Sequence, residues 1–455
     1  MRIFTPLLIL CAIVGNGYLS AQTTAITNVT VINPRDRRVE THRTVLIKGK
    51  QIAAVEPLPA HIPPGAAIIA GSGKFLIPGL WDAHVHLTKL GILSLPLFIA
   101  NGVTSVRDMG SNFAEVSGWR SQIENGTLLG PHIETSGQML ESTANIDRMK
   151  REHTIEPIDK LRIGVGNPRE GRAAVDRLAA LGVDHIKMRT TPDLATFLAV
   201  GDEARRFHLP FAAHPVVGPN ELIQAHLRSV EHFLAYPPIT LPREQREELF
   251  RRIAASGMFM SNTMANLSGL ELSVEQATAR LNDSTGKVDP LRKYVCGYLV
   301  EDWREQAGEL KDYPKSFRDE MIGEYYNFRD LKAAGVPFLA GTDAAVLFMY
   351  PGFSLHEELH DLVTKVGFSP MDVLRTATYN PVLFYGEERG RGAIQAGQPA
   401  DLVLLDADPT ADIQNTRRIQ GVISSGRWFD RRSLDTLLVE VEQHARTNCS
   451  DAIKH

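Results

Sequence analysis

The chain has 455 residues, of which 43% are hydrophobic and 22% are charged, and its formal net charge is -4. This composition is typical of globular proteins and lacks the basic excess that nucleic-acid binding requires, so no nucleic-acid partner is expected. The length exceeds one ordinary domain and suits a (β/α)₈ barrel of roughly 250 residues with a smaller companion domain.

Residues 1–21 read as a secretory signal peptide. A positive charge precedes an apolar run from Ile3 to Val14, and Ser20-Ala21 offers a cleavage point. The run is shorter than the roughly 20 residues of a membrane span. We therefore expect a periplasmic or secreted protein with no membrane attachment after cleavage; an uncleaved anchor is the alternative. The mature chain keeps Cys296 and Cys449, and the sequence does not decide whether they pair.

Short β-rich runs occupy both ends of the mature chain. Those of residues 22–78 are separated by Gly, Pro and Lys-Gly-Lys turn signals, and residues 389–431 have the same character. We expect the two segments to form one small β-sandwich built from both chain ends. Residues 432–455 follow as a tail whose first part, Arg432 to Arg446, has leucines at helical spacing and predicts a terminal helix.

Between these ends, residues 79–388 alternate β-rich runs with helix-like ones, which predicts a parallel sheet and, with eight candidate strands, a (β/α)₈ TIM barrel. The strands are expected within 81–86, 102–109, 132–137, 183–189, 209–215, 229–233, 257–264 and 336–343. Helices are clearest at 171–182 and 192–208. A charged, helix-rich insertion, residues 267–335, precedes the last strand, and insertions of this size usually cap or shape a site.

Two histidines, His84 and His86, close the first of these strands. Side chains alternate along a strand, so both imidazoles point to the same face. An isolated pair of this kind also occurs on the wet face of an edge strand. The other strand ends decide between the two interpretations.

Metal-ligand side chains end four further strands: Lys187 lies on the fourth, His214 and His232 end the fifth and sixth, and Asp343 ends the eighth. Singly, the histidines could be hydrogen-bonded core residues and Asp343 a helix N-cap or turn residue. Lys187 is harder to explain, because a buried ammonium needs a partner. In a barrel the carboxyl ends of all strands meet at one mouth, where these groups would form a site for a cation such as zinc.

These motifs resemble the amidohydrolase superfamily of metal-dependent hydrolases. The resemblance covers Ala25 to Asp430 and rests on the HxH after "PGLWDAH", the lysine of "GVDHIKM", the two single histidines and "AGTDA". The motifs "GVTSVRDMG", "SLHEEL", "TATYNP" and "GAIQAGQPADLVLLDADP" are most similar to the branch near imidazolonepropionase that includes prolidase-like dipeptidases and amidases.

The resemblance implies two divalent metal ions, with His84, His86 and Asp343 holding one and His214 and His232 the other. It also implies that Lys187 bridges the two ions, carboxylated by CO₂ to a carbamate because an ammonium has no lone pair to donate. Zinc is the default, although imidazole and carboxylate also suit manganese, cobalt and iron.

The resemblance further implies an enzyme, exported if the signal peptide is used, that hydrolyses a carbon–nitrogen bond in a dipeptide or an N-acyl amino acid. A metal-bridging hydroxide would be the nucleophile and Asp343 the catalytic proton shuttle. Mononuclear deaminases of the superfamily carry a glutamate three residues after the strand-five histidine; Val217 stands there, which disfavours deamination. Hydrolysis of esters, lactones or phosphotriesters stays open, as does a non-catalytic binding protein.

Three further residues are candidates for binding a small-molecule substrate. Arg107, at the end of the second strand, and Arg189, two positions beyond Lys187, could meet a substrate carboxylate, because guanidinium groups match carboxylates bidentately. A salt bridge at the barrel mouth among these arginines and Asp108 is the competing interpretation. His356, after the eighth strand, either lines the pocket or caps a helix. Homo-oligomer formation also stays open.

Overall fold

The computed structural model describes residues 23–447 apart from 153, 236–238, 284, 313–314 and 387–389. The predicted signal peptide and Cys449 lie outside the described residues. Cys296 takes part in a disulfide bond. Among the residues that the structure describes, no helix combines the length and apolar character that a membrane crossing requires.

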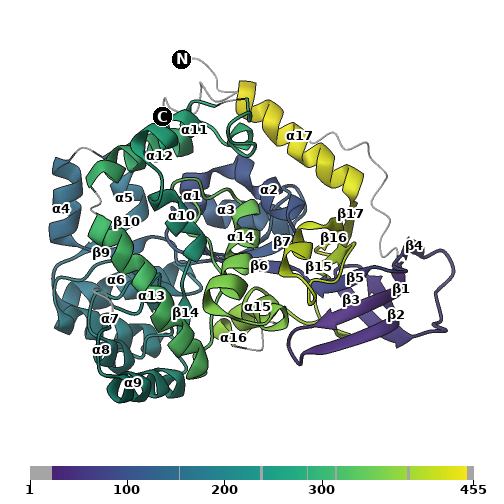
Figure 1. Ribbon diagram of the computed structural model, residues 1–455, viewed down its shortest axis with the longest axis horizontal. Coiled ribbons are helices and arrows are strands. Elements are labelled where there is room, and N and C mark those ends of the chain that lie inside the picture. Colours follow the sequence, from purple (N-terminus) through teal and green to yellow (C-terminus); the bar gives the residue numbers. More distant parts are fainter. Residues whose placement is uncertain are drawn as a thin grey trace.

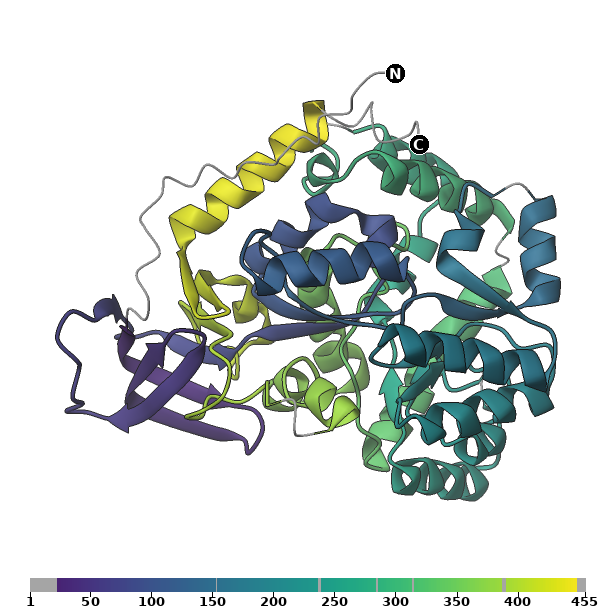
Figure 2. The same ribbon diagram turned by 180° about the vertical axis from the view of Figure 1, so that it is seen from behind.

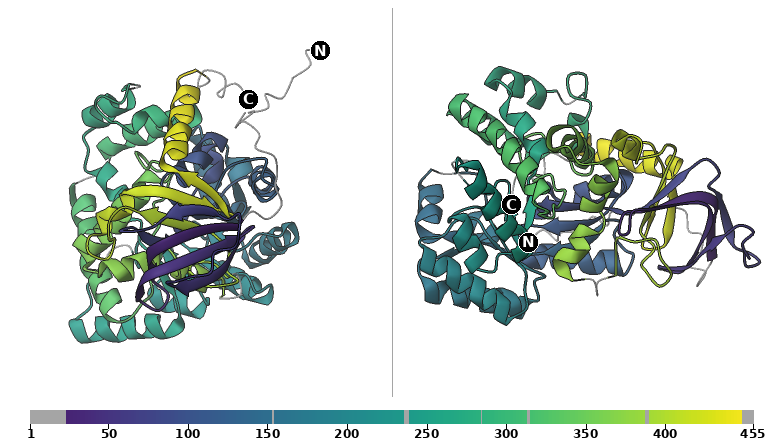
Figure 3. Two further views of the ribbon diagram at one scale, coloured as in Figure 1. Left: turned by 90° about the vertical axis from the view of Figure 1, so that its right-hand side faces the viewer. Right: turned by 60° about the horizontal axis from the view of Figure 1, so that its bottom comes forward.

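Strands from the two chain ends pair in one sheet of eight strands. The left view of Figure 3 shows the purple N-terminal strands beside the yellow C-terminal strands. Its order is β17-β16-β15-β5-β1-β2-β3, and β4 pairs with β1. The bounds are β1 Thr23–Asn33, β2 Arg38–Lys48, β3 Gln51–Pro57, β4 Ala67–Ala70, β5 Phe75–Pro78, β15 Leu402–Leu405, β16 Ile419–Ser424 and β17 Arg427–Asp430. The predicted Lys-Gly-Lys turn joins β2 to β3, with Gly49 at φ 60°.

The prediction that both ends build one β-domain is therefore confirmed, but its form as a two-sheet sandwich is not. The junction is β5, which pairs in parallel with β1 on one side and antiparallel with β15 on the other. Because β5 joins the two groups of strands, the hydrogen bonds run without interruption from the N-terminal to the C-terminal segment. Ile26, Val31, Leu76 and Leu402 are among the residues of its buried apolar core.

The middle of the chain forms two parallel sheets, of order β6-β7-β8 and β10-β9-β11-β12-β13-β14. The bounds are β6 Leu80–Val85, β7 Val103–Asp108, β8 His132–Thr135, β9 Met139–Ser142, β10 Arg162–Val165, β11 Ile186–Met188, β12 Phe211–Ala213, β13 Ser229–Glu231 and β14 Phe259–Ser261. The first seven predicted strands are confirmed by β6, β7, β8, β11, β12, β13 and β14. Strands β9 and β10 lie in the gap for which no strand was predicted.

The predicted eighth strand is extended but is not a regular strand. Its backbone bridges the two sheets: Leu339 N donates to Met260 O of β14 at 2.8 Å, and Ala83 N of β6 donates to Ala340 O at 2.9 Å. Pro337 has no N–H to donate, and Asp343 has a left-handed φ of 58°, so the ladder stays incomplete. The described strands thus form an α/β fold with two parallel sheets, and they do not form a single closed sheet.

Helices cover the outer faces of these sheets (Figures 1 and 2). Their bounds are α1 Leu87–Leu90, α2 Leu95–Ala100, α3 Phe113–Glu124, α4 Thr143–Arg151, α5 Ile158–Leu161, α6 Pro168–Leu181, α7 Leu194–Arg206, α8 Pro219–Gln224, α9 Arg243–Ser256, α14 Phe353–Asp361, α15 Pro370–Thr376, α16 Asn380–Tyr385 and α17 Arg431–Thr447. The predicted helix 171–182 is α6, which begins after the N-cap Asn167 and ends at Gly182, φ 82°.

The insertion 267–335 is helical, as predicted, and contains α10 Leu267–Leu270, α11 Val274–Leu281, α12 Tyr298–Glu309 and α13 Lys315–Ala333. The terminal helix is also confirmed: α17 buries Leu434, Leu437 and Val441 and packs beside α2 (Figure 1). Of the helices in this insertion, α12 contributes residues to the lining of the cavity described below.

Candidate metal centre and active-site cavity

The strand ends bring all six predicted metal-site residues to one place. His84 lies in β6 and His86 directly follows it, with ring centroids 5.5 Å apart. Lys187 is the middle residue of β11, and His214 and His232 directly follow β12 and β13. Asp343 ends the eighth extended segment and is fixed beside β6, because its N–H donates to His84 O at 2.8 Å.

The ligand atoms converge closely. Nε2 of His86 lies 3.1 Å and Nε2 of His84 lies 3.4 Å from Oδ1 of Asp343. On the other side, Nε2 of His214 and Nε2 of His232 are 3.2 Å apart. His84, His232 and Asp343 each offer one ligand atom, and these three atoms all lie within 4.8 Å of one another, a grouping that could hold a metal ion.

A second contact orients each of three imidazoles. Nδ1 of His84 lies 2.8 Å from Oε2 of Glu231, Nδ1 of His86 lies 3.3 Å from Gly110 O, and Nδ1 of His232 lies 2.8 Å from Oγ1 of Thr263. A carboxylate and a carbonyl only accept, so His84 and His86 donate through Nδ1. Their Nε2 lone pairs then face Asp343, as metal-ligating histidines require.

Burial sets protonation states that suit a cation. Removal from water lowers the pKa of His84 to about 3 and of His232 to about 4, and it lowers the pKa of His214 well below the usual value. Burial by itself would raise the pKa of Asp343, but the charges of His84 and His232 and the His86 contact hold it below its usual range. Near neutral pH His84, His214 and His232 are therefore neutral and Asp343 is ionised, and these are the metal-binding forms of the two groups.

Lys187 is a buried amine. It is 1% exposed, and its Nζ makes no hydrogen bond among the described residues. Burial lowers its pKa to about 8, opposed by the charges of Glu231 and Asp343. His84 Nε2 is likewise buried without a hydrogen-bond partner. Two buried polar atoms without hydrogen-bond partners, beside a carboxylate and three further imidazoles, form a donor set that fits a divalent cation.

Two of these residues have strained backbones. His232 has φ 70° and Asp343 has φ 58°, in the left-handed region that non-glycine residues seldom adopt. Such conformations persist where the surrounding structure over-determines them, and they cluster at functional sites. The strain turns both side chains away from their strand directions, toward the common centre.

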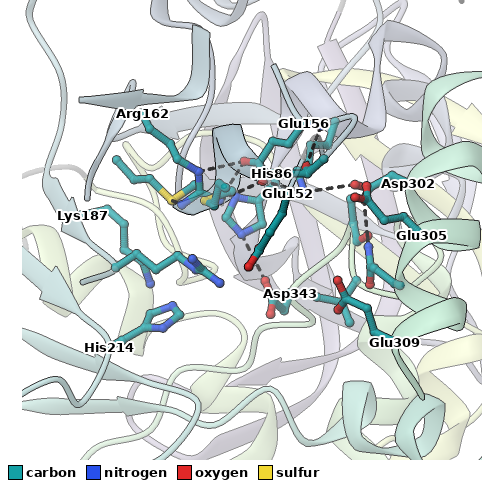
Figure 4. A pocket seen from close by; sticks show the side chains of 18 of the residues that line it. His86, Glu152, Glu156, Arg162, Lys187, His214, Asp302, Glu305, Glu309 and Asp343 are labelled. Atoms are coloured by element: carbon teal, nitrogen blue, oxygen red, sulfur yellow. Dashed lines mark hydrogen bonds and ion pairs between the residues drawn. The ribbon is translucent and has the colours of Figure 1, made fainter. Parts of the chain in front are cut away.

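A cavity of about 810 Å³ opens above this centre (Figure 4). Lys187, His214 and Asp343 line its base. Its walls come largely from two inserted segments, residues 148–156 and α12, whose Asp302, Glu305 and Glu309 face the cavity opposite Lys187. The insertion 267–335 therefore shapes the site, as its length suggested.

Charged pairs link the walls in a chain around the mouth. Arg189 contacts Glu141 at 3.4 Å, and Glu141 also pairs with Arg162. Arg162 pairs with Glu156 at 2.7 Å. Lys89 continues the chain, since its Nζ lies 3.8 Å from Glu156 and 3.4 Å from Asp302 of α12. A cavity with so many charged groups suits a polar substrate that carries charge of its own.

The three predicted substrate residues lie in different places. Arg189 lines the cavity, and its side chain is 37% exposed. Arg107 is 1% exposed, is absent from the cavity lining, and donates to Ala83 O, Ser229 and Glu231. It thus forms a buried salt bridge with Glu231 below the mouth, which neither interpretation predicted.

His356 is also absent from the cavity lining. It is 2% exposed and contacts Oγ1 of Thr416 at 2.9 Å and Asn101 O at 3.2 Å. Its place in α14 is structural, and it joins that helix to the C-terminal segment. Of the three candidates, the structure brings only Arg189 to the cavity.

Glu231, Thr263 and Glu141 were missed in the sequence. Glu231 immediately precedes His232, and strand alternation would place their side chains on opposite faces. His232 has a left-handed backbone and so departs from this alternation, and both Glu231 and His232 reach the same centre. The carboxylate in "SVEHF" was a visible signal. Nothing in the sequence indicated Thr263 or Glu141, whose contacts join strands distant in the chain.

Comparison with known proteins gives the family. Residues 75–429 match the amidohydrolase family. Three similar solved structures are a Xaa-Pro dipeptidase with bound methionine in the active site (20% identity, TM-score 0.68, 90% of this chain and 100% of the other), ochratoxinase of A. niger (21%, 0.65, 90% and 96%) and bottromycin amidohydrolase (20%, 0.70, 93% and 90%). Comparison with curated protein sequences gives no match.

The chain therefore belongs to the amidohydrolase family, and the resemblance drawn from its motifs is confirmed. It is a hydrolase that acts on carbon–nitrogen bonds. Members of this family generally use divalent metals, and the group formed by His84, His232 and Asp343 could hold one. Because the three solved structures are only 20% or 21% identical to this chain, their similarity is evidence for the fold alone.

Proposed function

We propose that the protein is an exported amidohydrolase with two metal ions, which cleaves the amide bond of a dipeptide or an N-acyl amino acid. In this proposal the two parallel sheets and residues 336–344 act as one (β/α)₈ barrel, with the chain-end strands as its companion domain. The observation that carries the proposal is the geometry of two ligand groups, His84-His86-Asp343 and His214-His232, that meet beside the unpartnered Nζ of Lys187.

Each of the two ligand groups would hold one cation. His84, His86 and Asp343 would hold one ion, and His214 and His232 the other, with zinc as the first expectation. Lys187 would contribute a carbamate formed with CO₂, which replaces an uncompensated buried amine by an anionic ligand that can reach both ions. Two divalent cations supply an activated water at neutral pH and polarise the substrate carbonyl.

The chain's own residues then move the proton. Asp343, ionised in the folded protein, accepts the proton of the attacking water and delivers it to the departing nitrogen. Its Oδ2 lies 3.5 Å from Nδ2 of Asn266 and 3.7 Å from Nδ1 of His232, contacts that restrict its rotation. The left-handed backbone at Asp343 fixes this carboxylate at the cavity base, where it can reach both the water and the leaving group.

Arg189 is the residue proposed to bind the substrate carboxylate. It lines the cavity two residues after Lys187 and keeps a long contact to Glu141, so its guanidinium retains donors for a ligand. Dipeptides and N-acyl amino acids both carry a free carboxylate on the amino acid whose nitrogen leaves when the amide bond is cleaved. This position therefore favours these substrates over neutral amides.

Export is proposed on two grounds. The N-terminal segment has the composition of a signal peptide, and Cys296 is disulfide-bonded. Disulfides persist mainly in oxidising compartments such as the periplasm and the extracellular space.

The test is metal analysis of the purified protein, followed by a screen of dipeptides, N-acyl amino acids, esters, lactones and phosphotriesters. We expect about two divalent ions per chain and hydrolysis of the amide substrates that a chelator abolishes. Hydrolysis of the esters, lactones or phosphotriesters alone would refute the substrate class. A protein that binds no divalent metal would refute the proposal itself.

A further inference from the structure

A buried ion pair lies directly beneath the metal centre. Glu231 of β13 and Arg107 of β7 are 0% and 1% exposed, and Nη2 of Arg107 lies 2.8 Å from Oε2 of Glu231. The same carboxylate oxygen lies 2.8 Å from Nδ1 of His84. One oxygen atom thus receives both a guanidinium and an imidazole N–H.

The other groups around this pair complete a rigid frame. Ser229 donates to Oε1 of Glu231 and accepts from Nη1 of Arg107 at 2.9 Å. Nε of Arg107 donates to the carbonyl of Ala83, the residue before His84. The frame therefore fixes the His84 side chain through Glu231 and its backbone through Arg107, and it joins β6, β7 and β13.

His84 differs from the other two oriented histidines in what its Nδ1 contacts. Nδ1 of His86 contacts a backbone carbonyl and Nδ1 of His232 a hydroxyl, whereas Nδ1 of His84 contacts a carboxylate. A carboxylate partner selects the tautomer with a bare Nε2 and makes the ring a stronger ligand. The bare Nε2 of His84 is the buried nitrogen that lacks a hydrogen-bond partner and lies 3.4 Å from Asp343.

We propose that Glu231, anchored by Arg107, is a positioning residue that holds His84 with Nε2 toward Asp343 and so sets the affinity of the first metal ion. This inference rests on the metal centre of the proposed function. Glu231 is too deep to touch substrate, because it is 0% exposed and does not line the cavity. Its effect is therefore on metal binding, independent of which substrate the enzyme takes.

The test compares metal affinity in three proteins, measured by competition with a chelator. Glu231→Gln keeps the shape of the side chain but leaves Arg107 buried without its counter-charge. This single variant is therefore expected to be less stable than the wild type. The double variant Glu231→Gln with Arg107→Met removes both charges and keeps the core neutral. Ser229→Ala is the matched control, since it removes a neighbouring contact and keeps the carboxylate.

We expect the double variant to unfold near the wild-type temperature and to bind the first ion about 10- to 100-fold more weakly. Ser229→Ala should stay within about threefold of the wild type, well below the loss expected for an outer-shell ligand partner. An affinity of the double variant equal to that of the wild type would overturn the positioning role and leave a purely structural ion pair. Wild-type protein that binds no metal would instead refute the proposed function.

A second readout needs no variant. In metal-free wild-type protein with ¹⁵N-labelled histidine, the long-range ¹H–¹⁵N spectrum should show His84 protonated at Nδ1 and bare at Nε2, assigned by loss of its signals in His84→Gln. A signal for the opposite tautomer would overturn the proposal even if both charge variants failed to fold.

Discussion

Replacing Lys187 by methionine is expected to stabilise the metal-free protein and to prevent formation of the proposed two-metal centre. The Lys187 amine is 1% exposed, and its Nζ has no hydrogen-bond partner. Burial lowers its pKa from 10.5 to about 8, a net effect that already contains the attraction of Glu231 and Asp343. The difference corresponds to about 3 kcal/mol of folding free energy at pH 7 that the charged amine costs the protein. Methionine has a similar length and carries no charge.

The assay is denaturant unfolding of chelator-treated wild type and Lys187→Met at several pH values. Because the folded-state pKa lies below the unfolded one, the cost is full below about pH 8 and disappears as pH rises through 10.5. The free energy of unfolding of the variant should therefore exceed that of the wild type by up to about 3 kcal/mol at pH 7, and the difference should disappear at alkaline pH.

Lys89→Met is the control for the Lys187 prediction. Lys89 lines the same cavity, but it is paired with Asp302 and Glu156, so its loss removes favourable ion pairs and gives no gain in stability. A metal-free Lys187→Met protein that is less stable than wild type at pH 7 would refute the reasoning, because Nζ would then have favourable contacts that the geometry does not provide.

Three further predictions concern catalysis and specificity. Asp343→Asn should retain most of the bound metal, measured by elemental analysis, but lower kcat by about 10²- to 10⁴-fold, the usual contribution of a proton-transfer group; turnover near the wild-type rate would exclude the shuttle role. Arg189→Leu should raise KM about 10- to 100-fold for substrates with a free carboxylate, the loss of one charged hydrogen-bonding group, and leave their C-terminal amides unchanged; an equal effect on both would place the carboxylate elsewhere. His356→Ala should cost about 1–3 kcal/mol in unfolding experiments, because Thr416 and Asn101 O lose a buried partner, while KM stays constant; a change in KM without loss of stability would return His356 to the substrate site.

The sequence could predict which side chains gather because their placement follows from local rules. His84 and His86 share a face by strand alternation, and the remaining ligands sit at or beside the ends of strands that run parallel. Those rules need no knowledge of the neighbouring strands. The same holds for α6, whose Asn and Gly caps are visible in the sequence.

Depth along the strands could not be predicted. Alternation gives the face that a side chain takes but not its height, so Arg107 was a candidate for the mouth although its guanidinium lies beneath it, on Glu231. The irregular eighth segment has a similar cause. Pro337 and the left-handed Asp343 break the ladder while the surrounding backbone hydrogen bonds still hold the segment between β14 and β6. Both outcomes depend on contacts between residues far apart in sequence.

The strand ends and the inserted helices have different roles in the site: the strand ends hold the candidate metal-site residues, and the inserted helices form part of the cavity wall. The ligand side chains are fixed from beneath: Asp82 of β6 accepts from both the N–H and the hydroxyl of Thr342, which holds the neighbouring Asp343 in its strained conformation. Two residues of the cavity wall, Glu305 and Glu309, stand instead on α12 of the insertion. Substitutions in α12 can therefore change the charge that a substrate meets while the frame around Glu231 and Asp82 keeps the metal ligands in place. Since a shift of about 1 Å at the reacting centre costs far more rate than a change in the outer wall, chemistry and specificity are separable in this fold.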